Sequence, residues 1–342
     1  MNIYFTEKNK KEYMKCVDEI ISQSRWSEGK YVQLFEKISF EKFGLKSVAL
    51  SNGGAALYLL YQYIDIRGKD VIVPGNTCWA TVAAIKLAGG NVIFADCNRE
   101  DLCLSYEDML TKITPNTVAV TVVHVGGHIA FDIEKIADYC EKNGIYLVED
   151  CAHAHGAEWN GKKPGMWGIG GAYSFYATKT LTTGEGGMVV TKYSEVEEYC
   201  KLQRNYGKKL IDGKVHFEYL DGFNFRISEF TAALGWIQMK NLEDILEEKR
   251  NVARKYDQIF DKHVKFPVGM KSGYYKYIAF DVPLKLGTGK VFAMHDQSSN
   301  LCNSAEKLSN CEWVAEHHVC PPIYCGLGFE NMNIEEIRNT IL

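Results

Sequence analysis

One lysine, Lys179, stands where an amine could react with a carbonyl group. The apolar run 172–176 comes just before it, and the glycine-rich stretch 180–187 follows it. Most loop lysines are simply solvated, but an amine held among apolar and small side chains loses hydration, which lowers its pKa and makes it a nucleophile. Ser174 leaves the same apolar run and could donate a hydrogen bond to an anion. The stretch therefore predicts a reactive amine beside an anion site.

An acidic residue, Asp150, ends a second apolar run and is followed by His153 and His155. A carboxylate at the end of a buried strand is unfavourable unless it meets a cation, a metal ion or hydrogen-bond donors. Two functional interpretations fit: a metal site built from the aspartate and the histidines, or an aspartate that pairs with a protonated ring nitrogen of a cofactor. An aspartate that caps a helix, with solvated histidines, is the structural alternative.

Gly53 and Gly54 lie between a short apolar run and the helical pattern of 55–64. Backbone N–H groups at such a helix start can hold a phosphate or a carboxylate, although a tight turn without a ligand would look the same. Trp79 follows another apolar run, where its ring could stack on a cofactor or pack in the core. Pyridoxal phosphate requires three groups together: a lysine that forms a Schiff base, a carboxylate that pairs with the pyridinium nitrogen, and a site that binds the phosphate anion.

The elements that must position these residues alternate along 47–191. Short apolar runs alternate with amphipathic stretches, which predicts an α/β fold with helices on both faces of a sheet. Uniformly apolar runs favour a mostly parallel sheet, with sites at the carboxyl ends of its strands. The predicted strands are 47–50, 70–74, 91–96, 117–123, 144–150, 172–176 and 186–191, and the predicted helices include 55–64, 79–88 and 131–144. Helical periodicity after Ser228 changes near Asn241. We expect a large domain over 1–240 and a smaller α+β domain over 241–342.

The composition excludes several classes of protein. The net charge is -4 and no basic block is present, which argues against nucleic-acid binding. No apolar run approaches the roughly 18 residues of a membrane span and the N-terminus has no apolar signal region, so we expect a cytoplasmic protein. The 11 cysteines are scattered singly, as in reduced proteins. We expect no metal site, because the closest cluster, His317, His318, Cys320 and Cys325, matches no usual zinc spacing.

The sequence resembles the DegT/DnrJ/EryC1/StrS family of sugar aminotransferases. The motifs that carry the resemblance are IYLVEDCAHAHGA (145–157), YSFYATKTLTTGEGGMVVT (173–191) and DGFNFRISEF (221–230). The resemblance runs continuously over about residues 20–260 and more loosely through CPPIYCGL (320–327). It implies the type I fold of pyridoxal-phosphate enzymes: a mostly parallel sheet with helices on both faces and a smaller C-terminal domain, which is short here.

The resemblance implies a role for each candidate residue. Lys179 would form the Schiff base with pyridoxal phosphate and carry the proton between the cofactor and the substrate carbon. Asp150 would pair with the pyridine nitrogen, and His153 would lie near the phenolic oxygen. Trp79 would stack on the ring, and Ser174 would hold the phosphate.

The resemblance also implies a homodimer, because Asn224 matches a phosphate contact that comes from the neighbouring subunit. Gly53 and Gly54 stand where the phosphate turn of the family usually reads Gly-Thr. One hydrogen bond to the phosphate, worth about 1.5–3 kcal/mol, is therefore missing unless Asn52 or a water replaces it. Gly126 stands where the family often has a bulky aromatic residue, which we expect to open the substrate pocket.

The implied activity is transfer of an amino group from glutamate or glutamine to a ketosugar, most readily a nucleotide-linked one, with pyridoxamine phosphate as the intermediate form. The product would serve amino-sugar biosynthesis for surface polysaccharides or glycosides. The alternative substrate is a cyclitol ketone of the inosose type. Sugar dehydration fits less well, because relatives that dehydrate replace the Schiff-base lysine with histidine. A non-catalytic regulator would need a broken site or a DNA-binding appendage, and neither is visible. Residues 284–301 match no segment of the family.

Overall fold

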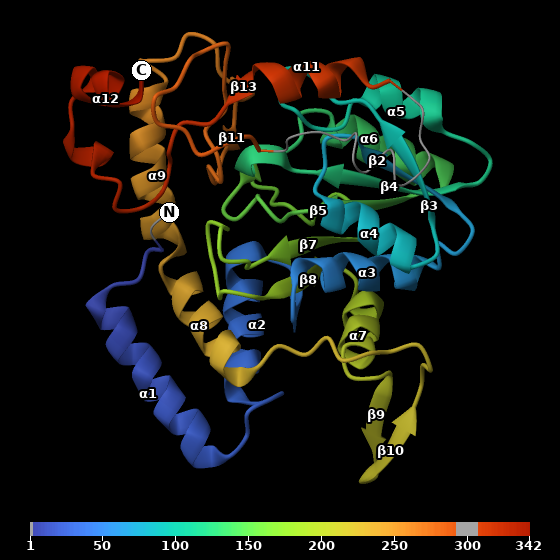
Figure 1. The fold of residues 1–342 in the computed structure, drawn as a ribbon. Coiled ribbons are helices and arrows are strands. Elements are labelled where there is room, and N and C mark those ends of the chain that lie inside the picture. The colour runs from blue at the N-terminus through green and yellow to red at the C-terminus, as the bar shows by residue number, and fades with distance from the viewer. Residues whose placement is uncertain (1–2, 292–306) are drawn as a thin grey trace.

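A central sheet organises the computed structural model, which describes residues 3–291 and 307–342 (Figure 1). Within these residues the sheet has seven strands in the order β1-β8-β7-β5-β4-β2-β3. The strands are β1 Lys46–Leu50, β2 Asp70–Pro74, β3 Asn91–Ala95, β4 Thr117–Val123, β5 Tyr146–Asp150, β7 Gly170–Ser174 and β8 Gly187–Thr191. β8 pairs antiparallel with both of its neighbours, and the other neighbouring pairs are parallel. The predicted mostly parallel sheet is confirmed.

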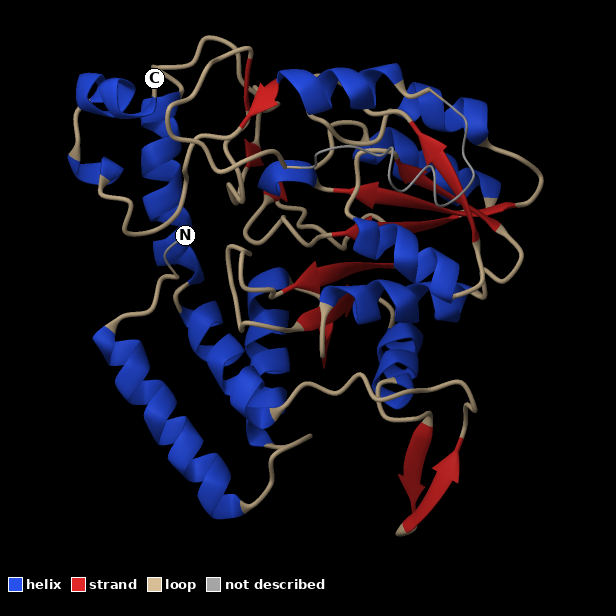
Figure 2. Cartoon of the chain, in the orientation of Figure 1, coloured by secondary structure: helices blue, strands red, loops and turns tan. Residues whose placement is uncertain are grey.

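Helices cover both faces of the sheet, as the cartoon in Figure 2 shows. α3 and α4 lie against one face, and α5 and α6 lie on the other, which is the arrangement that right-handed crossovers produce for this strand order. The longer helices are α1 Glu7–Gln23, α2 Lys30–Phe43, α3 Gly53–Ile64, α4 Trp79–Leu87, α5 Tyr106–Lys112, α6 Ile133–Asn143, α7 Ser194–Gln203, α8 Glu229–Lys240, α9 Leu242–Tyr256, α11 Ser309–His317 and α12 Ile334–Ile341. The predicted α/β fold with helices on both faces is confirmed.

Local sequence signals set the ends of several helices. α3 begins after Asn52, whose side-chain oxygen accepts a hydrogen bond from the backbone N–H of Ala55 at 2.8 Å. α6 ends at Gly144, which adopts a φ of 65° that suits glycine. The predicted helical stretch after Ser228 divides at Asn241 into α8 and α9. These boundaries agree with the sequence pattern because capping is a local interaction.

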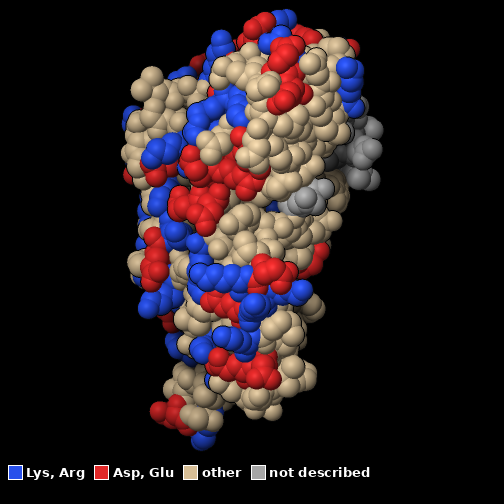
Figure 3. All heavy atoms as spheres, turned by 90° about the vertical axis from the view of Figure 1, so that its left-hand side faces the viewer, with Lys and Arg blue, Asp and Glu red and all other residues tan. Residues whose placement is uncertain are grey.

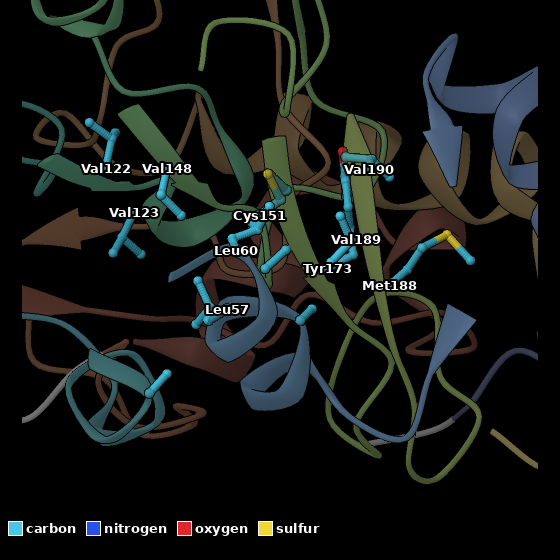
Figure 4. Close-up of a cluster of buried hydrophobic side chains, with 14 of the residues drawn as sticks. Leu57, Leu60, Val122, Val123, Val148, Cys151, Tyr173, Met188, Val189 and Val190 are labelled. Carbon is cyan, nitrogen blue, oxygen red and sulfur yellow. The ribbon is translucent and has the colours of Figure 1, made fainter. Parts of the chain in front are cut away.

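The main hydrophobic core lies between α3 and the sheet. Leu57 and Leu60 of α3 point toward the strands, where Val123 of β4, Val148 of β5 and Val189 of β8 lie (Figure 4). All five side chains are buried. Burying a side chain of this size contributes about 1.5–3 kcal/mol each. The core therefore anchors the strand ends firmly, and the loops that leave those ends start from fixed positions.

A second hydrophobic cluster forms in the C-terminal part of the chain. It draws on α9, on the short pair β12 Ala279–Phe280 and β13 His318–Val319, on the turn η2 Phe329–Asn331 and on α12. Leu242, Ile245 and Leu246 at the start of α9 belong to the main core instead. The division into domains 1–240 and 241–342 stays a prediction. Of the unmatched segment 284–301, residues 292–301 lie outside the described residues.

Smaller elements project from or link these layers. They are the hairpin β9 Lys208–Ile211 and β10 Lys214–Phe217, the pair β6 Glu158–Trp159 and β11 Met270–Lys271, and the short η1 helix Val125–Gly127. The hairpin points away from the body of the molecule (Figure 1).

Lysine, arginine and acidic side chains are interspersed on the face around α1, α8 and α9 (Figure 3). None of the helices in the described residues is both long and apolar enough to span a membrane.

Candidate active site

The parallel strands bring the predicted residues to one edge of the sheet. The pairing registers place Asp150 of β5 opposite Ala172 of β7, and Ser174 of β7 opposite Gly187 of β8, which in turn pairs with Leu50 of β1. The loops after β1, β2, β5 and β7 therefore leave the same edge. This is where sites form in sheets of this kind.

Asp150 is buried, with 4% of its surface exposed, and its carboxylate is held by two donors. Oδ2 accepts a hydrogen bond from the Thr81 hydroxyl at 2.7 Å, and Oδ1 accepts one from the backbone N–H of Ala152 at 3.0 Å. Thr81 Oγ1 itself accepts a hydrogen bond from Thr77. Each carboxylate oxygen keeps a further lone pair, so Asp150 can still pair with a cationic N–H group. Sequence reasoning missed Thr81, since only the packing of α4 against β5 brings it to Asp150.

Lys179 is partly buried, and its amine lies 4.8 Å from the centre of the Tyr275 ring. Loss of hydration lowers the pKa of Lys179, and the Lys276 ammonium lowers that pKa further. The Asp150 carboxylate and Cys78 act in the opposite direction, but burial has the largest effect. More of the Lys179 amine is therefore unprotonated than in a solvated lysine, which favours reaction with a carbonyl group.

His153 shares the same aromatic neighbour. Its ring stacks on that of Tyr275, with the centres 4.1 Å apart and the planes 19° from parallel. Burial, followed by the charge of Lys179, lowers the pKa of His153 well below its usual value. The ring is therefore neutral at pH 7, and it shares Tyr275 as a neighbour with Lys179. Sequence reasoning missed Tyr275, because no local pattern marks it.

His155 has a different environment. It is fully buried between the rings of Tyr173 and Phe175, at 5.1 and 5.2 Å, and burial lowers its pKa to about 3. Neither ring nitrogen has a hydrogen-bond partner among the described residues. Within the described ranges, no cluster of potential metal ligands contains His155 or Asp150. His155 therefore belongs to the core, and the expectation that this stretch holds no metal ion stays a prediction.

The N-terminus of α3 lies against the end of β7. A Cβ atom at Gly53 would lie 2.8 Å from the Cβ of Ser174, so only glycine permits this approach. The N–H groups of Gly53 and Gly54 open the helix and have no acceptor within it, which leaves them available to an anion. The side-chain oxygen of Asn52 is used to cap Ala55. The Asn52 amide nitrogen donates to the Ser51 hydroxyl at 3.2 Å and keeps a second proton, so it can still donate to an anion in place of the hydroxyl that Gly54 lacks.

Trp79 and Ser174 complete the set of predicted residues at this edge. Trp79 is the first residue of α4 and is 46% exposed, so it does not pack in the core, and its ring can stack on a flat ligand. The Ser174 hydroxyl oxygen accepts a hydrogen bond from the backbone N–H of Tyr176 at 3.3 Å. The Ser174 O–H group remains able to donate to an anion.

Gly126 does not widen the site, and the expectation of an open pocket there is wrong. A Cβ atom at Gly126 would lie 2.6 Å from Cδ1 of Ile278, and the backbone φ is +70°. The Gly126 carbonyl also accepts a hydrogen bond from the backbone N–H of Lys276 at 2.9 Å. The missing side chain instead lets the segment 272–278 approach the loop after β4. In this way Tyr275 and Lys276 reach the site from the C-terminal part of the chain.

Asn224 lies on an exposed segment that follows the β9–β10 hairpin. Its side-chain oxygen accepts a hydrogen bond from the backbone N–H of Arg226 at 3.3 Å, and its backbone forms a bridge with Asn205. The next carbonyl, that of Phe225, accepts a hydrogen bond from the Ser51 N–H at 2.8 Å. The segment therefore passes beside the start of α3 in its own chain. The contact of Asn224 with a neighbouring subunit stays a prediction.

Known proteins match the chain over most of its length. It is 38% identical over 253 residues to the GDP-perosamine synthase of Vibrio cholerae, covering 72% of this chain and 67% of that protein. It is 34% identical over 244 residues to the UDP-4-amino-4,6-dideoxy-N-acetyl-beta-L-altrosamine transaminase of Campylobacter jejuni, covering 70% and 64%. Spr1654 from Streptococcus pneumoniae, solved in PLP and PMP forms, has a similar fold: its PLP form gives a TM-score of 0.84 at 19% identity, covering 99% and 97% of the two chains.

A family model agrees with these relatives and with the geometry of the site. Residues 7–339 match the model of the DegT/DnrJ/EryC1/StrS aminotransferase family. The match includes the strand ends that carry Asp150, Ser174 and Lys179. The fold, these relatives and the family model together establish that the chain belongs to the DegT/DnrJ/EryC1/StrS aminotransferase family.

Proposed function

We propose that this aminotransferase moves an amino group from glutamate or glutamine to a nucleotide-linked ketosugar, for the biosynthesis of amino sugars in surface polysaccharides or glycosides. The observation that carries the proposal is the Lys179 amine, partly desolvated at the carboxyl edge of the sheet where Asp150 is buried. The names of the two relatives, which refer to GDP- and UDP-linked sugars, support a nucleotide-linked sugar over a cyclitol.

Pyridoxal phosphate is the cofactor of this family, and the residues at the edge fit it. Asp150 has the spare acceptor capacity to hold a protonated ring nitrogen, and Trp79 is exposed for stacking on the ring. Gly53 and Ser174 approach each other closely and present donors for the phosphate. Bound there, the cofactor supplies an aldehyde carbon that takes up amines and a ring that stabilises negative charge on the neighbouring substrate carbon.

The side chains divide the proton transfers among them. The unprotonated Lys179 Nζ accepts the proton from the carbon of the amino donor and later delivers a proton to the former ketone carbon of the sugar. The Asp150 carboxylate keeps a proton on the cofactor ring nitrogen, because a buried negative charge favours the cationic form beside it. The neutral His153 ring has an N–H group to donate to the phenolic oxygen. Tyr275 partly covers the reacting amine and so reduces its contact with water.

The proposed enzyme is a homodimer in which Asn224 contacts the cofactor phosphate of the neighbouring subunit. The β9–β10 hairpin and the segment after it support an interface, because they expose large apolar side chains. These side chains are Leu210, Val215, Phe217, Leu220 and Phe223. Such a surface is stabilised when a second copy covers it.

Mixed dimers test the role of Asn224 across subunits. Asn224→Ala and Lys179→Ala are each expected to lack activity as pure proteins. A mixture of the two, unfolded and refolded together, should recover activity, because one site in each mixed dimer contains Lys179 from one chain and Asn224 from the other. No recovery, or a monomeric wild type in sedimentation, would contradict the dimer proposal.

The activity is tested by following the two half-reactions separately. Wild-type protein loaded with pyridoxal phosphate should turn into the pyridoxamine form with glutamate or glutamine. A panel of nucleotide-linked ketosugars then shows which one restores the pyridoxal absorbance. Lys179→Ala should lose both steps, whereas Lys192→Ala, an exposed lysine at the opposite end of β8, should keep them. A wild-type protein that holds no pyridoxal phosphate and transfers no amine would refute the proposal.

A further inference from the structure

Three lysine amines converge on one short segment of the site. Lys179 Nζ and Lys276 Nζ lie 4.8 and 5.7 Å from the centre of the same Tyr275 ring. Lys249 of α9 donates a hydrogen bond to the carbonyl of Tyr274, the residue before that ring, at 3.1 Å. The reacting amine is therefore accompanied by two further positive groups.

Carboxylates do not balance these two further charges. In the residues that the structure describes, neither Lys249 nor Lys276 forms an ion pair with an acidic side chain. Lys249 is 6% exposed and its amine is used within the fold, since it also donates to the Thr180 hydroxyl at 3.3 Å. Unbalanced positive charge among buried groups attracts anions more strongly than it would in open solvent.

Lys276 has the geometry to use this attraction. Its side chain is only partly buried, and its Nζ donates to the carbonyl and the hydroxyl oxygen of Thr288 at 2.9 and 3.0 Å. Thr288 is fixed in turn, because its N–H donates to the Cys320 carbonyl at 2.9 Å. An ammonium group has three protons, so these two bonds hold the amine in place and leave the third proton for a ligand.

Lys276 lies at a different place along the edge of the sheet from Gly53 and Ser174, the residues proposed to hold the cofactor phosphate. Its backbone is bonded to Gly126 after β4, whereas Gly53 follows β1 and Ser174 ends β7. In the strand order β1-β8-β7-β5-β4, Asp150 on β5 lies between the two. An anion at Lys276 is therefore a different group from the cofactor phosphate.

We propose that Lys276 binds a negatively charged oxygen of a substrate while an amino group is transferred to or from that substrate at Lys179. This inference rests on the proposed function and deepens it, because it names the group that each candidate substrate would present. The oxygen belongs to the carboxylate of the amino donor or to the diphosphate of the nucleotide-linked sugar. The shared chemistry is one charge-assisted hydrogen bond from the third Lys276 proton.

The variant Lys276→Met tests the proposal, with Lys290→Met as its matched control. Lys290 also lies in the C-terminal part and donates to two backbone carbonyls, those of Glu316 and His318. Both variants are loaded with pyridoxal phosphate, and the half-reactions with glutamate and with the nucleotide-linked ketosugar are measured separately. Binding of glutarate and of inorganic pyrophosphate is measured by calorimetry on the same proteins, which needs no turnover.

Lys276→Met should raise the half-saturating concentration of one substrate at least about tenfold, which corresponds to about 1.4 kcal/mol, and weaken the matching probe similarly. An effect on glutamate and glutarate assigns the carboxylate, and an effect on the ketosugar and pyrophosphate assigns the diphosphate. The proposal is overturned if neither pair changes, if Lys290→Met has the same effect, or if Lys276→Met loses the cofactor. If the wild type binds a probe through Lys276 but transfers no amine, the anion site stands and the proposed function fails.

Discussion

The buried Glu149 carboxylate ties the end of β5 to the loop before β7, and Glu149→Gln tests how strongly. Glu149 Oε1 accepts hydrogen bonds from the backbone N–H groups of Trp167 and Gly168, both at 2.8 Å. Oε2 accepts one from Gly165 at 2.7 Å and lies 3.1 Å from Nε2 of His124. The side chain is fully buried, so a partner that loses its bond gains no water in exchange.

The magnitude follows from counting acceptors. In Glu149→Gln one oxygen becomes an NH₂ group, which faces two donors whichever way the amide is turned. His124 cannot become the acceptor without loss, because its Nδ1 already accepts the N–H of Ala130 at 3.2 Å. Two lost bonds to a charged group, at about 1.5–3 kcal/mol each, predict a loss of about 3–6 kcal/mol in the free energy of unfolding. This is a large share of the roughly 5–15 kcal/mol that stabilises a typical domain.

Denaturant unfolding at pH 7 measures the effect. Glu158→Gln is the control, since the Glu158 carboxylate pairs at 2.9 Å with the exposed Lys271, and a pair of this kind is worth about 0–1 kcal/mol. A loss below about 1 kcal/mol for Glu149→Gln, with an unchanged dependence of the unfolding free energy on denaturant, would refute the reasoning.

Three further predictions concern groups in or near the site. His155→Phe removes a buried base whose pKa is about 3, and between pH 6.5 and 3 only the unfolded wild-type chain gains the proton of this histidine. The variant should therefore lose less stability than the wild type as the pH falls through that range. Thermal unfolding across the range measures this, and identical curves would contradict it. Burial lowers the pKa of Lys249 from 10.5 to about 8, so wild-type stability should rise from pH 8 to 10, where the unfolded chain binds more protons. Lys249→Met should lack that rise and be more stable at pH 7 by about 1–3 kcal/mol, and chemical unfolding at both pH values decides this. Gly53→Ala should weaken pyridoxal-phosphate binding at least about tenfold, because its Cβ would press on Ser174 at 2.8 Å. Gly54→Thr, whose nearest contact would be at 3.3 Å, should strengthen binding, and equal affinities in an absorbance titration would show both expectations wrong.

Much of the fold could be predicted from the sequence, because the signals are local. β2 and β4 have the predicted bounds 70–74 and 117–123, and the predicted end of α6 is the cap at Gly144. An apolar run shows that a strand is buried, and a capping residue shows where a helix stops, without reference to the rest of the chain. The parallel arrangement followed from the same runs, since strands buried on both faces need helices between them.

The candidate site was predicted only in part. Asp150, Ser174 and Gly53 were placed at one edge by the rule that parallel strands end together. Thr81 and Tyr275 were missed, because each reaches the site through the packing of an element remote in the sequence. Gly126 was misjudged, since a missing side chain leaves space for a ligand or for another segment, and only the packed structure shows which fills it.

By itself, the sequence determined which residues with reactive or charged groups stand at strand ends, and so the class of chemistry that Lys179 and Asp150 can support. The tertiary structure decided what surrounds them: the Thr81 hydroxyl on Asp150, the Tyr275 ring beside Lys179, and Lys276 near the same ring. The physical reason is the distance along the chain over which each kind of interaction acts. Periodicity and capping act over a few residues, whereas the hydration and charge that set the reactivity of Lys179 depend on groups nearly a hundred residues away in the chain.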